Sequence, residues 1–262
     1  MDSGLWLLTL FAEPWGSFQL RDVHKTNVAW SSYPFLPPTT ADGLLASVAG
    51  GQRWMEGNFH KPRSLRDLEW GGGLAALGGY PLEGDYARPH FRAHVNTLMS
   101  YDGPLWAPPK GQQSAGKKPA KVTDYLCERL RFVVAGNKDG LEELWEKVIG
   151  RVSPFAKKSV LYLPYEQSPD ISPLSSGEAT TATESLTALP MVEMGSMPRN
   201  AHPYLTPVKS KAESKGKGYK VTWSHLNCIW EPGVKVRQGT SLFIADNGSA
   251  ISKSLLEAIL EE

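Results

Sequence analysis

The sequence predicts an α+β domain in which the elements follow in the order strand, helix, strand, strand, helix, strand. Two amphipathic helices, one after a pair of prolines and one over residues 141–150, lie between apolar runs that are typical of buried strands. The content of 41% hydrophobic and 21% charged residues suits a globular protein, and 25 glycines and 20 prolines predict long irregular connections. This order of elements is that of the ferredoxin-like fold, βαββαβ.

The first two elements are a strand over residues 4–11 and a helix that follows two prolines. The strand is a Leu- and Trp-rich run without polar alternation, which predicts burial on both faces. Pro37 and Pro38 prevent a central strand from continuing and set up a turn. Thr39 or Thr40 is the expected N-cap of the helix, and a Gly-Gly pair ends it.

The middle of the chain alternates strictly between polar and apolar residues after a short apolar strand over residues 74–80. This period of two predicts a strand over residues 88–101 with one polar, basic face. Either an ordinary edge strand or a surface that faces RNA explains the pattern. The basic face carries Arg88, His90, Arg92 and His94.

A long loop without hydrophobic periodicity covers residues 102–121. It is rich in Pro, Gly and Lys, and no carboxylate occurs between Pro104 and Val122. In a compact domain such a loop is either functional or disordered. A strand around Phe132, the second helix and a last strand near residue 164 complete the predicted domain, which spans residues 1–166.

The remaining third of the sequence divides into two parts. Residues 167–189 are rich in Ser and Thr and nearly uncharged, which predicts an exposed linker or insertion. Residues 190–262 are expected to form a smaller β-rich region that ends in a helix, with Trp223 and Trp230 packed against its sheet.

The run Trp30–Gly50 carries a resemblance to a known family. Its pattern of aromatic-Pro-x-x-Pro-Pro-Thr, a small residue, Gly-Leu-Leu and a further Gly resembles the first helix of the Cas-five family, the RAMP-type subunits of CRISPR effector complexes (Cascade). The segments FAEPWGSF and DYLCERLRFVV are also similar to family segments, whereas Pro164 stands where the family usually has Gly. The resemblance covers about the first two-thirds of the chain.

The resemblance implies an RRM-like domain with a protruding thumb hairpin at about residues 102–121. It implies a cytoplasmic subunit that holds the 5′ handle of the CRISPR RNA (crRNA). The implied partners are a backbone subunit of the Cas-seven family, a large subunit of the Cas-eight family and target DNA near the PAM. The residues expected to bind RNA are polar, basic or aromatic: Gln19, Arg21, His24 and Lys25 after the first strand, Arg88, His90, Arg92 and His94, then Trp106, Lys110, Lys117, Lys118 and Lys121 in the thumb, and Arg199 and His202.

Charge and cysteine content limit the functional classes. The formal net charge is +1, so an anionic partner must be bound by a local patch rather than by the whole surface. Cys127 and Cys228 lack metal-ligand spacing and are expected to be buried thiols of a cytosolic protein. No metal or other cofactor is expected. No apolar run approaches the ~20 residues of a membrane helix, and no membrane partner is expected.

RNA cleavage without a metal needs a base for the 2′-hydroxyl and an acid or cation for the leaving oxygen. Residues of suitable type are present, but no arrangement of them stands out: His24, Lys25, Tyr86, His90 and His94. We therefore expect a non-catalytic RNA-binding subunit. The alternatives are a metal-independent endoribonuclease that processes pre-crRNA on the same fold, and an unrelated RRM-like protein, against which the missing RNP-type motif counts.

Overall fold

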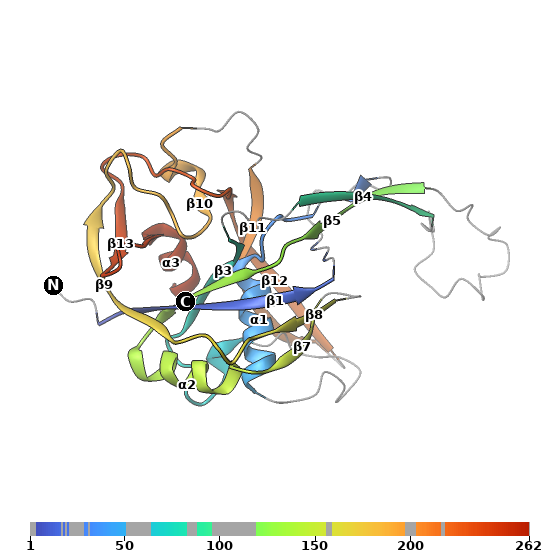
Figure 1. Cartoon of the computed structure of the whole chain (residues 1–262), viewed down its shortest axis with the longest axis horizontal. Helices are drawn as coiled ribbons and strands as arrows, with labels where there is room; N and C mark the ends of the chain where they lie inside the picture. Colours follow the sequence, from blue (N-terminus) through green and yellow to red (C-terminus); the bar gives the residue numbers. More distant parts are fainter. Residues whose placement is uncertain are drawn as a thin grey trace.

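The computed structural model describes residues 4–16, 18, 20, 29–30, 32–50, 64–82, 88–95, 119–155, 159–196, 203–215 and 218–261. The protein is a mixed α+β structure with mostly antiparallel strands and three α-helices (Figure 1). In chain order the elements are β1 (Trp6–Trp15), β2 (Ala29–Trp30), α1 (Pro38–Ala49), a 3₁₀ helix η1 (Leu65–Asp67), β3 (Ala75–Pro81), β4 (Arg88–Val95), β5 (Pro119–Leu126), β6 (Leu130–Gly136), α2 (Lys138–Val148), β7 (Val152–Phe155), β8 (Ser159–Tyr162), β9 (Asp170–Glu178), β10 (Leu189–Pro190), a 3₁₀ helix η2 (Met191–Glu193), β11 (Tyr204–Lys215), β12 (Gly218–Ile229), β13 (Ser241–Ala245), β14 (Ala250–Ser252) and α3 (Lys253–Leu260).

The central sheet is built around β1. Its strands follow the order β14-β13-β9-β1-β6-β3, and every neighbouring pair is antiparallel. On one side of β1 lies β6, and on the other side two strands share its length. Residues 6–9 of β1 pair with β9, and residues 13–15 pair with β8 of the β7–β8 hairpin.

Helices cover the two faces of this sheet. Alternate residues of β1 point to opposite faces, so Leu8 and Leu10 pack with Leu45 of α1 and Leu144 of α2 in one core. Leu7 packs on the opposite face in a second core, which includes side chains of α3 and an aromatic cluster formed by residues from several segments. In that cluster the rings of Phe35, Tyr80 and Trp230 lie 5.5–6.0 Å apart: Phe35–Tyr80 5.6 Å, Phe35–Trp230 6.0 Å and Tyr80–Trp230 5.5 Å.

The predicted cap of α1 is wrong, although the helix itself is confirmed. Pro37 occupies the N-cap position, Pro38 follows at the first helical position, and no side chain caps the helix. Proline suits the first helical position, here that of Pro38, because it has no N–H group to satisfy and its φ angle is already helical. Thr39 instead donates its hydroxyl to the carbonyl of Pro207, at 3.3 Å, and ties α1 to β11.

The C-terminal third is more closely joined to the first part than the sequence suggests. The predicted linker, 167–189, contains β9, which lies between β1 and β13 in the central sheet. In β9 only Leu174 is buried. This strand is held in the sheet by main-chain pairing with β1 and β13 rather than by many apolar side chains. A separate three-stranded sheet has the order β10-β12-β11. Trp230 packs there as predicted, but Trp223 is 48% exposed, and its predicted packing is wrong.

No helix in the described part of the chain is both long and apolar enough to span a membrane.

Candidate nucleic-acid interface

A third sheet, β2-β5-β4, forms a ribbon that extends away from the rest of the molecule (Figure 1). The strands β4 and β5 are antiparallel and paired over their whole length, and β2 adds to β5 in parallel. In the chain β4 and β5, the β4–β5 ribbon, are inserted between β3 and β6, two neighbours in the central sheet, whereas β2 precedes α1. The strand predicted over residues 88–101 is confirmed for residues 88–95, which form β4.

The register of the ribbon sorts the predicted basic residues between its two faces. Residues paired across an antiparallel ladder share a face. Arg88, His90, Arg92 and His94 alternate along β4 and therefore belong to one face, where their partners are Leu126, Asp124, Val122 and Ala120. Lys121 pairs with Ala93 and belongs to the other face. Lys121 is thus part of a strand, not of a loop, and is separated from the row on β4.

The base of the ribbon is fixed to the core through Tyr125. The main chains of Phe18 and Tyr125 exchange two hydrogen bonds, of 2.9 and 2.8 Å, and the Phe18 ring packs on Phe155 with centroids 5.3 Å apart. Burial raises the pKa of Tyr125, which also hydrogen-bonds to the side chain of Tyr204. Tyr125 is 9% exposed, whereas Leu126, the partner of Arg88, is 47% exposed. At the base of the ribbon, the side chain of Leu126 is therefore open to solvent, whereas that of Tyr125 packs on the core.

Most of the other predicted RNA-binding residues lie outside the described residues. Of the predicted thumb, 102–121, the structure describes only residues 119–121, which begin β5. The expected roles of these residues stay predictions. The residues concerned are Gln19, Arg21, His24, Lys25, Trp106, Lys110, Lys117, Lys118, Arg199 and His202.

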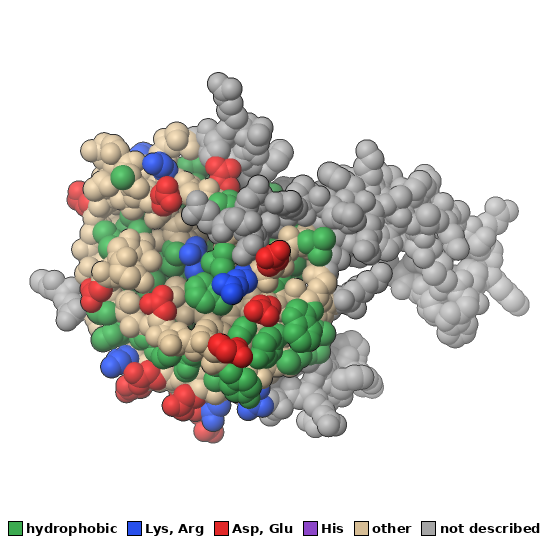
Figure 2. Space-filling view, in the orientation of Figure 1, with side chains coloured by type: hydrophobic (Ala, Val, Ile, Leu, Met, Phe, Trp, Pro, Cys, Tyr) green, Lys and Arg blue, Asp and Glu red, His purple; other side chains and the backbone are tan. Residues whose placement is uncertain are grey.

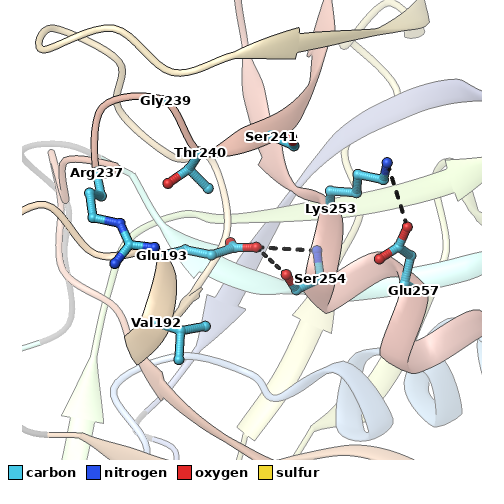
Figure 3. A pocket seen from close by; sticks show the side chains of 9 residues that line it. All are labelled: Val192, Glu193, Arg237, Gly239, Thr240, Ser241, Lys253, Ser254 and Glu257. Carbon is cyan, nitrogen blue, oxygen red and sulfur yellow. Dashed lines mark hydrogen bonds and ion pairs between the residues drawn. The ribbon is translucent and has the colours of Figure 1, made fainter.

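Sequence reasoning missed a hollow of about 440 Å³ beside the start of α3 (Figure 3). Glu193, 4% exposed, accepts hydrogen bonds in this hollow from the main-chain N–H and the hydroxyl of Ser254. In the described part of the chain, Glu193 Oε2 and Thr240 Oγ1 have no hydrogen-bond partner. The carboxylate lies at the positive end of the α3 dipole and stabilises the start of that helix. No local sequence pattern predicts this hollow, because the elements that line it, η2, β13 and α3, are far apart in sequence.

Charges of both signs are interspersed on one face of the molecule. On the face shown in Figure 2, Lys and Arg side chains lie among Asp and Glu side chains, and hydrophobic side chains separate them. This distribution agrees with the net charge of +1. Among the described residues, no group of three or more His, Cys, Asp or Glu side chains is placed to hold a metal ion.

Comparison with protein-family models gives no match for this chain, and comparison with curated proteins gives no similar sequence.

Proposed function

We propose that this protein is a non-catalytic crRNA-binding subunit of a CRISPR effector complex and that it holds the repeat-derived 5′ handle along the β4–β5 ribbon. The observation that carries the proposal is the ribbon itself. It is a paired extension with a row of two arginines and two histidines on one face, inserted between two strands of the central sheet.

The topology supports a ferredoxin-like, RRM-like domain of the RAMP type. The strands β1, β3, β6 and β9 alternate with α1 and α2 in the order βαββαβ, and they lie side by side as β9-β1-β6-β3. This spatial order, with every neighbour antiparallel, is what two β-α-β crossovers produce when they interleave in one sheet. The position of the ribbon, between the second and third strands of this unit, is where the resemblance to the Cas-five family implies a thumb.

The proposed mode of action is binding rather than chemistry. Arg88 and Arg92 would hold phosphates through charge-assisted hydrogen bonds, which fix the position of an RNA strand without reading its sequence. Trp106, in the segment that joins β4 to β5, would stack on a splayed base. The backbone and large subunits of the complex, together with target DNA near the PAM, are the proposed partners.

The direct test is to incubate the purified protein with labelled repeat RNA, with and without a chelator, and to analyse both binding and products. The proposal predicts a retained complex and intact RNA. A 2′,3′-cyclic phosphate product that forms without metal and is lost in His90→Ala or His94→Ala would replace it with the endoribonuclease alternative. Failure to bind repeat RNA would reject both.

A further inference from the structure

A second concentration of positive charge lies on the hairpin formed by β11 and β12. Between Val208 and Val221 the chain has five lysines and one glutamate. The two strands pair from Tyr204 and Cys228 to Lys215 and Gly218, with one irregularity at Pro207–Lys209. Beyond this irregularity the register is regular, so the faces of the hairpin follow from the pairing.

The lysines with described side chains lie on one face. Lys209 pairs with Ser224, Lys211 with Thr222, and Lys220 with Glu213, so these residues share a face on which hydroxyl groups lie between the cations. The apolar residues Ala212, Val221 and Trp223 alternate with them and belong to the opposite face. We call the first set, Lys209, Lys211, Glu213, Lys220, Thr222 and Ser224, the lysine face.

The only carboxylate of this face neutralises little of its charge. Glu213 lies 3.7 Å from the ammonium group of Lys211, and the two side chains are 58% and 76% exposed. An ion pair so open to solvent contributes little and does not fix either side chain. Among the described residues of the lysine face, three cations thus stand against one carboxylate.

The inner end of the lysine face is anchored to the core. Val208 is 4% exposed, and the carbonyls of Pro207 and Leu205 accept hydrogen bonds from Thr39 and Tyr33. Lys209 lines a cleft of about 100 Å³ that also includes Arg66. The Arg66 guanidinium donates to the main-chain carbonyls of Leu74 and Ile259 and is therefore held in place. A fixed cation thus lies at the end of the lysine row.

We propose that the lysine face is a second binding surface for the phosphate backbone of single-stranded RNA. This inference rests on the proposed function, because it assigns a further contact to the same RNA. Residues on one face of a strand recur every ~6.8 Å, a spacing comparable to that of successive phosphates in an extended single strand. The hydroxyl of Ser224 adds a donor for a phosphate oxygen, whereas the hydroxyl of Thr222 donates to the main-chain carbonyl of Lys211 at 3.3 Å. A membrane is a poorer fit, because the lysine face has no apolar side chain to insert between lipids.

The base of the hairpin adjoins the base of the β4–β5 ribbon. Tyr204 begins β11, and Tyr125, its hydrogen-bond partner, lies at the base of the β4–β5 ribbon. The β11–β12 hairpin and the β4–β5 ribbon therefore start from adjoining points of the core.

The test measures repeat-RNA affinity against salt concentration for the full chain and two triple variants. The hairpin variant is Lys209→Gln, Lys211→Gln and Lys220→Gln. The matched control is Lys138→Gln, Lys147→Gln and Lys253→Gln, three helix lysines that each pair with a glutamate four residues away. Both change the net charge equally. The slope of log affinity against log salt should fall by up to about 2 in the hairpin variant, ~0.7 for each phosphate that a lysine no longer neutralises, and stay unchanged in the control.

Three outcomes would overturn the inference. If the hairpin variant and the control behave alike while wild type binds RNA, the lysine face is not a binding surface, and the proposed function stands. If wild type does not bind repeat RNA, both fail. If phosphatidylserine vesicles, but not RNA, distinguish the hairpin variant from the control, the face binds membranes instead. Lys→Arg at the same three positions should restore the salt slope, and a thermal melt checks that each variant folds.

Discussion

The side-chain amide of Gln167 hydrogen-bonds to both main-chain groups of Phe11. The N–H of Phe11 donates to Gln167 Oε1 at 2.7 Å, and Gln167 Nε2 donates to the carbonyl of Phe11 at 2.8 Å. Phe11 lies between the stretch of β1 that pairs with β9 and the stretch that pairs with β8. A side chain thus takes the place of a peptide group and closes the gap in the ladder.

Replacement of Gln167 by Ala should destabilise the protein, because both main-chain groups of Phe11 lose their partner. We expect the free energy of unfolding to fall by about 1–3 kcal/mol, measured by urea denaturation. Gln238→Ala, at an exposed position, is the control and should change it by less than ~0.5 kcal/mol. Equal effects of the two substitutions would show that water replaces the Gln167 amide without cost.

The buried carboxylate of Glu193 should also matter for stability. Glu193→Ala removes the acceptor for two donors of Ser254 and a negative charge at the start of α3. The expected loss in the free energy of unfolding is about 1–3 kcal/mol. Glu257→Ala, which removes an exposed partner of Lys253, should cost less than ~0.5 kcal/mol. A Glu193 variant as stable as wild type would mean that α3 does not need this contact.

Asp42 should give the protein a pH dependence that opposes the usual loss of stability in acid. Burial raises the pKa of its carboxyl above 3.8, although Ser64 and the N–H of Leu65 hydrogen-bond to it. The unfolded chain therefore loses this proton at lower pH than the folded chain does. Stability from this group is greatest below pH 3.8, falls as pH rises through the folded pKa, and stays lower above it.

The Asp42→Asn variant tests this sign directly, because the amide keeps a hydrogen-bond acceptor but cannot ionise. Denaturation curves at a series of pH values from 3.8 upward give the stability difference between variant and wild type. That difference should shift in favour of the variant as pH rises and then become constant. A difference that is independent of pH, or that shifts the other way, would contradict the raised pKa.

The two cysteines should differ strongly in reactivity. Cys228 is fully buried, and burial raises the pKa of its thiol to about 12, whereas Cys127 is partly exposed. Because the thiolate is the reactive form, iodoacetamide should label Cys127 well before Cys228 in the folded protein. Peptide mass spectrometry follows the two sites, and both should react at similar rates in denaturant. If Cys228 is labelled as fast as Cys127 in the folded protein, the burial of the Cys228 thiol is contradicted.

A local sequence pattern is sufficient to predict an element when one stretch of sequence contains all the residues that determine it. The helix α2 buries Leu141, Leu144 and Val148 as its period predicts. The strand β9 cannot be predicted in the same way, because its Ser-rich sequence is held by main-chain pairing with β1 and β13. The same limit applies to β5, because the composition of its first residues, 119–121, is typical of a loop.

The candidate site shows the same division between local and long-range information. The alternation of Arg88, His90, Arg92 and His94 predicts β4 from a single stretch. The separation of Lys121 from that row depends on the register between β4 and β5, which no local pattern contains. Glu193 meets Ser254 only after η2 and α3 have packed together, so its burial is not predictable either.

The proposed function depends most on RNA binding along the ribbon and its connecting segment, 96–118. Replacing Lys110, Lys117, Lys118 and Lys121 by Ala tests this, with repeat-RNA affinity measured across salt concentrations. The salt slope should fall by up to ~0.7 for each phosphate that is no longer neutralised, while the thermal melt stays unchanged. Trp106→Ala should cost about 1–3 kcal/mol of binding free energy at an unchanged slope, as expected for base stacking. A quadruple variant with wild-type affinity and salt slope would contradict the placement of RNA on the connecting segment and the adjoining end of the ribbon.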